Sequence, residues 1–191
     1  MNQPNLHAPD WSKIPAPVDD GGAAHLKGMT IPPVSLKATD DTMVNLSALR
    51  GRTVVFAYPR TGEPGKIALV DDWDMIPGAR GCTPQTCAFR DLFAELKAAG
   101  AAHVFGLSTQ SNEYQTEMAG RLHLPFPVLS DEKLEMTRAL DLPTMQVAGL
   151  TLIKRLALII DDARITHLFY PVFPPDRNAG DVLAWLQKHK A

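Results

Sequence analysis

Short β-like runs and helix-like stretches alternate along most of the chain. Residues 53–58 form a continuous β-branched and aromatic run, which is typical of a strand buried on both faces. A hairpin is expected over 34–46, with its turn at Asp40-Asp41. Four further strands are expected near 102–107, 127–129, 155–160 and 165–169. Helical periodicity predicts helices over 83–100, 112–122, 132–140 and 179–189. This order predicts an α/β fold with a mixed central sheet.

The helix predicted over 83–100 has the clearest boundaries. Thr83 is a good N-cap residue, Pro84 suits the first helical position, and Gly100 is a suitable stop. The apolar face of this helix has the expected spacing of i, i+3, i+4 and i+7 and comprises Phe89, Leu92, Phe93 and Leu96.

Both cysteines of the chain, Cys82 and Cys87, lie at the start of this helix. A thiol at that place meets unpaired backbone N–H groups and the positive end of the helix dipole. Both features favour the thiolate, which is the form that attacks electrophiles. The pair therefore indicates redox chemistry.

Bulk properties indicate one small enzyme. The 191 residues are 45% apolar and 21% charged, which is ordinary for a globular domain. A formal net charge of −2 argues against a nucleic-acid partner, and no apolar run approaches the length of a membrane span. Residues 1–20 are polar and proline-rich without an apolar h-region, so a reducing cytoplasm is expected, where cysteine pairs are more often catalytic or metal-binding than structural.

The chain is expected to divide into an N-terminal arm, residues 1–30, and a domain, residues 31–191. The arm contains several prolines and little periodicity, and Trp11 is its candidate anchor.

The segment from Gly81 to Asp91 resembles a motif of the peroxiredoxins, in particular the bacterioferritin-comigratory or Q type. The matching positions are Gly81, Cys82, Thr83, Cys87, Arg90 and Asp91. The resemblance extends over roughly residues 29–187 and includes 56–59, 106–109, 129–131 and Arg155. It implies a thioredoxin-like fold whose central sheet is flanked by helices, with the arm and hairpin added at the N-terminus.

The resemblance also implies a thiol-dependent peroxidase acting on hydrogen peroxide and organic hydroperoxides. Cys82 would attack the peroxide and become a sulfenic acid, with Arg155 favouring the thiolate. Cys87 would resolve it to an intramolecular disulfide, which a thioredoxin or glutaredoxin-like partner would reduce. No metal or organic cofactor is implied, and a monomer is expected, with a weak dimer as the alternative.

The chain departs from the family pattern Pro-x-x-x-Thr-x-x-Cys. Met75 and Ala79 stand where the proline and threonine belong. An insertion after Pro59 would explain this, and Thr61 could then supply the hydroxyl only where the loop folds back. A one-residue slip would instead match a different peroxiredoxin subtype and make Cys87 the reactive thiol.

Two further functions stay open. One is a thiol redox sensor or binding module without turnover, which the missing threonine favours. The other is a thioredoxin-like metal-handling protein whose two thiolates bind copper or zinc, although no His or Met occupies an obvious ligand position.

Two structural hypotheses follow from the same segment. In a regular helix, residues five apart have Cα atoms about 8.7 Å apart, beyond the roughly 7 Å that a disulfide spans, so bond formation should unwind the helix. The long connection over 60–80 is expected to be a cover over the thiol, with a surface insertion as the alternative. Its apolar residues include Ile67, Leu69, Val70, Trp73 and Ile76, which give it enough apolar surface to pack down.

Overall fold

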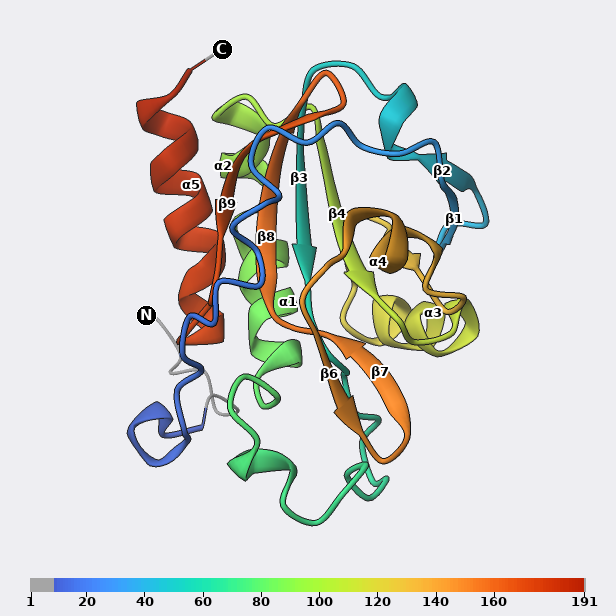
Figure 1. Cartoon of the computed structure of the whole chain (residues 1–191), viewed down its shortest axis with the longest axis vertical. Helices are drawn as coiled ribbons and strands as arrows, with labels where there is room; N and C mark the ends of the chain where they lie inside the picture. The colour runs from blue at the N-terminus through green and yellow to red at the C-terminus, as the bar shows by residue number, and fades with distance from the viewer. Residues whose placement is uncertain (1–8, 191) are drawn as a thin grey trace.

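A mixed sheet of seven strands forms the centre of the computed structural model, which describes residues 9–190 (Figure 1). The order across the sheet is β2-β1-β5-β4-β3-β8-β9, and β3, β4 and β5 run parallel to one another. The strands are β1 (Ser35–Ala38), β2 (Met43–Asn45), β3 (Arg52–Ala57), β4 (His103–Ser108), β5 (Val128–Ser130), β8 (Leu156–Asp161) and β9 (Arg164–Phe169). The expected strands and the hairpin at Asp40-Asp41 are thus confirmed to within two residues at most ends.

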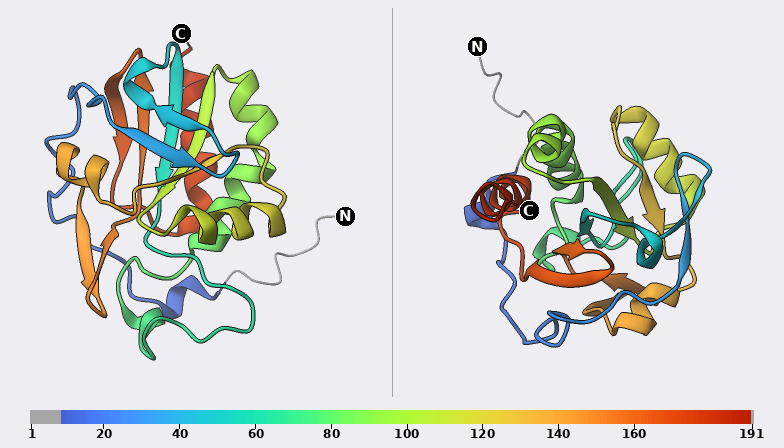
Figure 2. Two further views of the ribbon diagram at one scale, coloured as in Figure 1. Left: turned by 90° about the vertical axis from the view of Figure 1, so that its right-hand side faces the viewer. Right: turned by 90° about the horizontal axis from the view of Figure 1, so that it is seen from above.

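The helices cover both faces of this sheet (Figure 2). They are α1 (Cys82–Asp91), α2 (Phe93–Ala98), α3 (Asn112–Arg121), α4 (Glu135–Leu140) and α5 (Asn178–Lys188), with 3-10 turns η1 (Trp11–Lys13), η2 (Leu46–Ala48), η3 (Trp73–Met75) and η4 (Pro175–Arg177). Alternate residues of β3 serve the two sides, because successive strand residues point to opposite faces. Val54 and Phe56 pack in the cluster that includes side chains of α1, α2 and α5, whereas Val55 and Ala57 pack in the cluster that includes α4.

The prediction of one helix over 83–100 is corrected in two places. The helix begins at Cys82, so Gly81 rather than Thr83 is its N-cap, with a φ of 106° that favours glycine. Leu92, at φ −100° and ψ 11°, leaves the helical region and separates α1 from α2. Cys82 therefore lies inside the first turn, where its sulfur is close to the helix N-terminus.

A hairpin that the sequence analysis did not predict, β6 (Thr144–Val147) with β7 (Leu150–Ile153), lies beyond one end of the main sheet (Figure 1). It packs against the inserted segment 60–80. Trp73 and Ala79 of that segment share a buried cluster with Val147 and Leu152 of the hairpin. The long connection is therefore held down by tertiary contacts, although its Ile67 is 91% exposed.

Residues 9–20 of the expected N-terminal arm lie along the surface, and Trp11 anchors them, as expected. The indole Nε1 of Trp11 donates a hydrogen bond of 3.0 Å to Asp176 Oδ2 in η4. Further along, Ala23, Leu26 and Ile31 are buried in the core cluster that also contains α4. Residues 1–8 of the expected arm lie outside the described residues.

Candidate active site

Cys82 is the first residue of α1 and is 3% exposed. It belongs to the apolar cluster that includes Tyr58 and Phe89. Its Sγ lies 3.5 Å from the carbonyl oxygen of Ala79. The first backbone N–H groups of the helix have no partner within the helix, so negative charge at this position is favoured by the chain itself.

Arg155, between β7 and β8, brings a positive charge directly to this sulfur. Its Nη2 lies 3.2 Å from Cys82 Sγ, although the two residues are far apart in the sequence. The same nitrogen lies 3.1–3.2 Å from the carbonyl oxygens of Gly78, Ala79 and Arg80. The guanidinium is 2% exposed and is thus fixed by the loop that precedes the helix. Such a charge-assisted contact favours negative charge on the sulfur.

Gln85, a buried residue one turn after Cys82, holds the other side of the guanidinium. Its Oε1 accepts a hydrogen bond from Arg155 Nη1, and its Nε2 donates to Asn178 Oδ1 at 2.9 Å. Asn178 begins α5, so the two helices together orient the arginine. The sequence analysis missed both residues; a glutamine on the Cys82 side of α1 was the one local signal, since residues three apart share a helix face.

Tyr58 lies beside the thiol without adding negative charge. Burial, reinforced by the charge of Cys82, raises the pKa of the Tyr58 hydroxyl well above its usual value. That hydroxyl donates a hydrogen bond of 2.8 Å to Gln115 Oε1. The tyrosine therefore stays protonated and supplies an apolar wall to the cysteine.

Cys87 lies on the same helix in a different environment. It is half-buried, and both cysteines are free thiols. Burial raises the pKa of the Cys87 thiol above its usual value. Because α1 includes both cysteines, their Cα atoms are separated by about 8.7 Å of helix geometry, as expected, and the folded helix holds the thiols apart.

Thr61 does not replace the missing family threonine in this conformation. Its backbone N–H and its hydroxyl donate to Gln110 Oε1 at 2.9 and 3.2 Å, and its carbonyl oxygen accepts from Gln110 Nε2 at 3.1 Å. Ala79, at the threonine position, contributes its carbonyl oxygen to Arg155 and to the thiol. The hydrogen-bond partners of Cys82 Sγ among the described residues are thus a guanidinium and a backbone carbonyl.

Within residues 9–190, no group of three or more His, Cys, Asp or Glu side chains is placed to hold a metal ion. No helix in the same range is long and apolar enough to cross a membrane.

Comparisons with known proteins converge on one family. The Redoxin profile matches residues 26–183. The chain is 32% identical over 188 residues to chloroplastic peroxiredoxin Q of Sedum lineare, covering 96% of this chain and 91% of that protein. It is 32% identical over 167 residues to peroxiredoxin Bcp of Escherichia coli K12, covering 85% and 96%. The fold is similar to the crystal structure of peroxidoxin BcpB from Mycobacterium tuberculosis, with a TM-score of 0.70, 26% identity and coverage of 87% of this chain and all of that one.

Proposed function

Because the chain belongs to the redoxin family and to its peroxiredoxin Q branch, which are thiol peroxidases, we propose that Cys82 reduces peroxides and that Cys87 resolves the product. The observation that carries this assignment of roles is the 3.2 Å contact between Arg155 Nη2 and Cys82 Sγ at the start of α1. It favours Cys82 over the one-residue-slip alternative, because a guanidinium in contact with a sulfur favours negative charge there, whereas the surroundings of Cys87 raise the pKa of its thiol, with burial as the largest cause.

The reaction follows from sulfur chemistry. The Cys82 thiolate attacks one peroxide oxygen, the O–O bond breaks, and the other oxygen leaves as water or an alcohol after taking a proton. Negative charge that develops on the leaving oxygen is stabilised by the Arg155 guanidinium and the N–H groups of the first turn of α1. Hydrogen peroxide and organic hydroperoxides are the proposed substrates.

Resolution requires a change of conformation. Cys87 attacks the sulfenic acid of Cys82, releasing water and forming an intramolecular disulfide. The first turns of α1 must unwind, because a disulfide spans less than about 7 Å between Cα atoms and the helix holds these at about 8.7 Å. A thioredoxin or glutaredoxin-like partner then restores both thiols by exchange, in a reducing compartment such as the cytoplasm. We propose a monomer as the working form.

A thiol sensor without turnover is the second candidate, and the absence of the family threonine next to Cys82 is what favours it. The two candidates differ in catalysis alone. Backbone donors at the helix start and Arg155 provide the stabilisation that the hydroxyl would share, which supports turnover.

A thioredoxin-coupled peroxidase assay separates the candidates. The parent protein should consume peroxide over many turnovers, and Cys82→Ser should lose about 10³-fold or more, as when a covalent nucleophile is removed. Cys87→Ser should complete one turnover and then stall without an added small thiol. A parent that stops after one equivalent of peroxide would establish the sensor.

A further inference from the structure

The outer side of the helix start is covered by two residues that are distant in the sequence. A Cβ added to Gly81 would lie 2.6 Å from Pro175 Cγ and 2.7 Å from Trp11 Cη2. The rings of Trp11 and Pro175 are therefore packed directly on the backbone of the residue that precedes Cys82. Only glycine permits this approach at that position.

Trp11 is itself fixed in place. Its Nε1 donates 3.0 Å to Asp176 Oδ2, and its ring meets Phe173 edge-on, with centroids 6.0 Å apart and planes at 77°. Farther along the arm, Pro17 Cβ would lie 3.5 Å from a Cβ on Gly78. The arm thus covers the outside of the same 78–81 loop whose carbonyls bind Arg155 on the inside.

A second attachment of the arm lies at Asp20. Asp20 accepts a hydrogen bond of 2.6 Å from the Tyr170 hydroxyl and pairs with Lys154, the neighbour of Arg155. Residues 11–20 are therefore attached at both ends, with the active-site loop between the attachments.

Unwinding that displaces residues 81–83 breaks these contacts, because the rings of Trp11 and Pro175 fit the folded position of the Gly81 backbone. The free energy of this packing therefore adds to the free energy needed to unwind the helix. The chemical attack on peroxide takes place in the folded helix and does not carry this cost.

We propose that Trp11 is a positioning residue that keeps α1 folded and thereby slows disulfide formation relative to peroxide attack. This inference rests on the proposed roles of Cys82 and Cys87. The sulfenic acid then persists long enough for two competing outcomes. Attack by Cys87 gives the disulfide and water, whereas a second peroxide molecule, ROOH, oxidises the sulfenic acid to a sulfinic acid and leaves as ROH. Trp11 shifts this partition toward the sulfinic acid at high peroxide.

Trp11→Ala tests the proposal in the full-length protein. The reduced protein is mixed with one equivalent of hydrogen peroxide, quenched with an alkylating reagent at set times and analysed by mass. Disulfide formation should accelerate about tenfold, which corresponds to about 1.4 kcal/mol, while sulfenic acid formation changes less than about twofold. At excess peroxide the sulfinic acid fraction of Cys82 should fall. Trp11→Phe, which retains a ring but loses the bond to Asp176, should be intermediate. Lys13→Ala, on the same turn with an 81% exposed side chain, is the matched control and should behave as the parent.

Several results would overturn the proposal. An unchanged rate of disulfide formation in both Trp11 variants would show that the contact is only structural, even where the melting temperature falls. A slower first step would place Trp11 in the peroxide site instead. Should Trp11→Ala fail to fold, the Phe variant and amide exchange of residues 9–18 in the parent decide: exchange must be faster in the disulfide form than in the dithiol form. A parent that forms no disulfide contradicts the proposed function itself, independently of Trp11.

Discussion

Two thiols on one helix have opposite surroundings. Cys82 is 3% exposed, lies at the positive end of α1 and has the Arg155 guanidinium 3.2 Å from its sulfur. Cys87, a turn and a half later, is half-buried, and burial raises the pKa of its thiol. The positions of the two thiols along the helix and the contact with Arg155 account for the difference between their surroundings.

The difference indicates a division of labour. A nucleophile benefits from fixed charge and a rigid site, since stabilisation of the developing charge then needs no reorganisation in the transition state. A resolving thiol must instead move toward the sulfenic acid, and its part of the helix must unwind to allow this. The hydrogen bonds that fix Arg155 beside Cys82, donated to Gln85 and the 78–80 carbonyls, and the unwinding expected of α1 are thus competing demands on one short helix.

Removal of the Arg155 guanidinium should reduce the difference between the two thiols most strongly. Arg155→Met deletes the charge-assisted contact to the thiolate, and we expect sulfenic acid formation to slow about 100-fold, which corresponds to the 1.5–3 kcal/mol that such a contact is typically worth. Arg155→Lys should recover part of the rate, because it returns the charge without the planar donor geometry. The measurement is the single-turnover rate of sulfenic acid formation, with no reductant present.

Arg164→Met, at an exposed position on β9, is the matched control and should leave that rate unchanged. Each variant needs a thermal unfolding curve, since Arg155 is buried. A folded Arg155→Met protein with a rate within about threefold of the parent would remove the arginine from the mechanism.

The pH dependence of resolution should sharpen the comparison. The pKa of Cys87 is raised in the folded helix, so the folded state favours the neutral thiol and ionisation favours the unwound state. The thiolate fraction of the unwound state therefore grows with pH below the ordinary thiol pKa of about 8.5, and the unwound fraction itself grows only above that pH. Disulfide formation should accelerate by about tenfold per unit between about pH 6 and 8, because the thiolate is the attacking form.

Rapid mixing at one equivalent of peroxide, followed by alkylation and mass analysis, gives this rate apart from the first step. A pH-independent rate over the same interval would contradict attack by an ionised Cys87.

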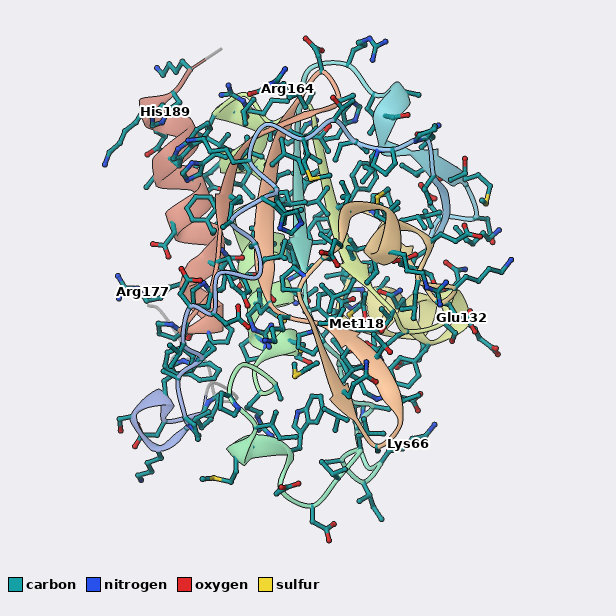
Figure 3. All side chains as sticks on the ribbon, in the orientation of Figure 1. Lys66, Met118, Glu132, Arg164, Arg177 and His189 are labelled. Atoms are coloured by element: carbon teal, nitrogen blue, oxygen red, sulfur yellow. The ribbon has the colours of Figure 1, made fainter. Side chains whose placement is uncertain are left out.

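The inserted segment should have the smallest effect. Trp73 and Ala79 pack with Val147 and Leu152, so part of this segment is held in place rather than a free insertion. Lys66, in the same segment, lies at the end of the molecule opposite His189 (Figure 3). Replacement of residues 66–76 by a short Gly-Ser link should change the ratio of rates for cumene hydroperoxide and hydrogen peroxide by about threefold, as expected for altered apolar contacts with a substrate. The assay should also vary the thioredoxin concentration. If the folded variant matches the parent in its dependence on hydrogen peroxide, cumene hydroperoxide and thioredoxin, the segment is a surface insertion without a role.

Local patterning predicted the sheet well and the helix boundaries less well. β3 and β8 are apolar runs long enough to be recognised, whereas β6 and β7 have four residues each and merge with the apolar run that follows. The start of α1 depends on Gly81, whose positive φ accommodates Trp11 and Pro175. Neither contact can be inferred from the residues around position 81.

Prediction of the active-site residues from the sequence was limited in the same way. The helix start indicated a favoured thiolate at Cys82, and the family resemblance singled out Arg155, which the structure places against the sulfur. Gln85 and Asn178 could not be foreseen, because a buried amide pair between two helices has no local signature. Tertiary contacts decide which polar residues meet.

Trapping of the first oxidation product tests the central claim most directly. Cys82→Ser and Cys87→Ser proteins are each treated with limited hydrogen peroxide in the presence of a reagent that labels sulfenic acid, and the labelled peptide is identified by mass. We expect the label on Cys82 of the Cys87→Ser protein and almost none on Cys87 of the Cys82→Ser protein. The opposite pattern would make Cys87 the nucleophile and contradict the assignment of roles.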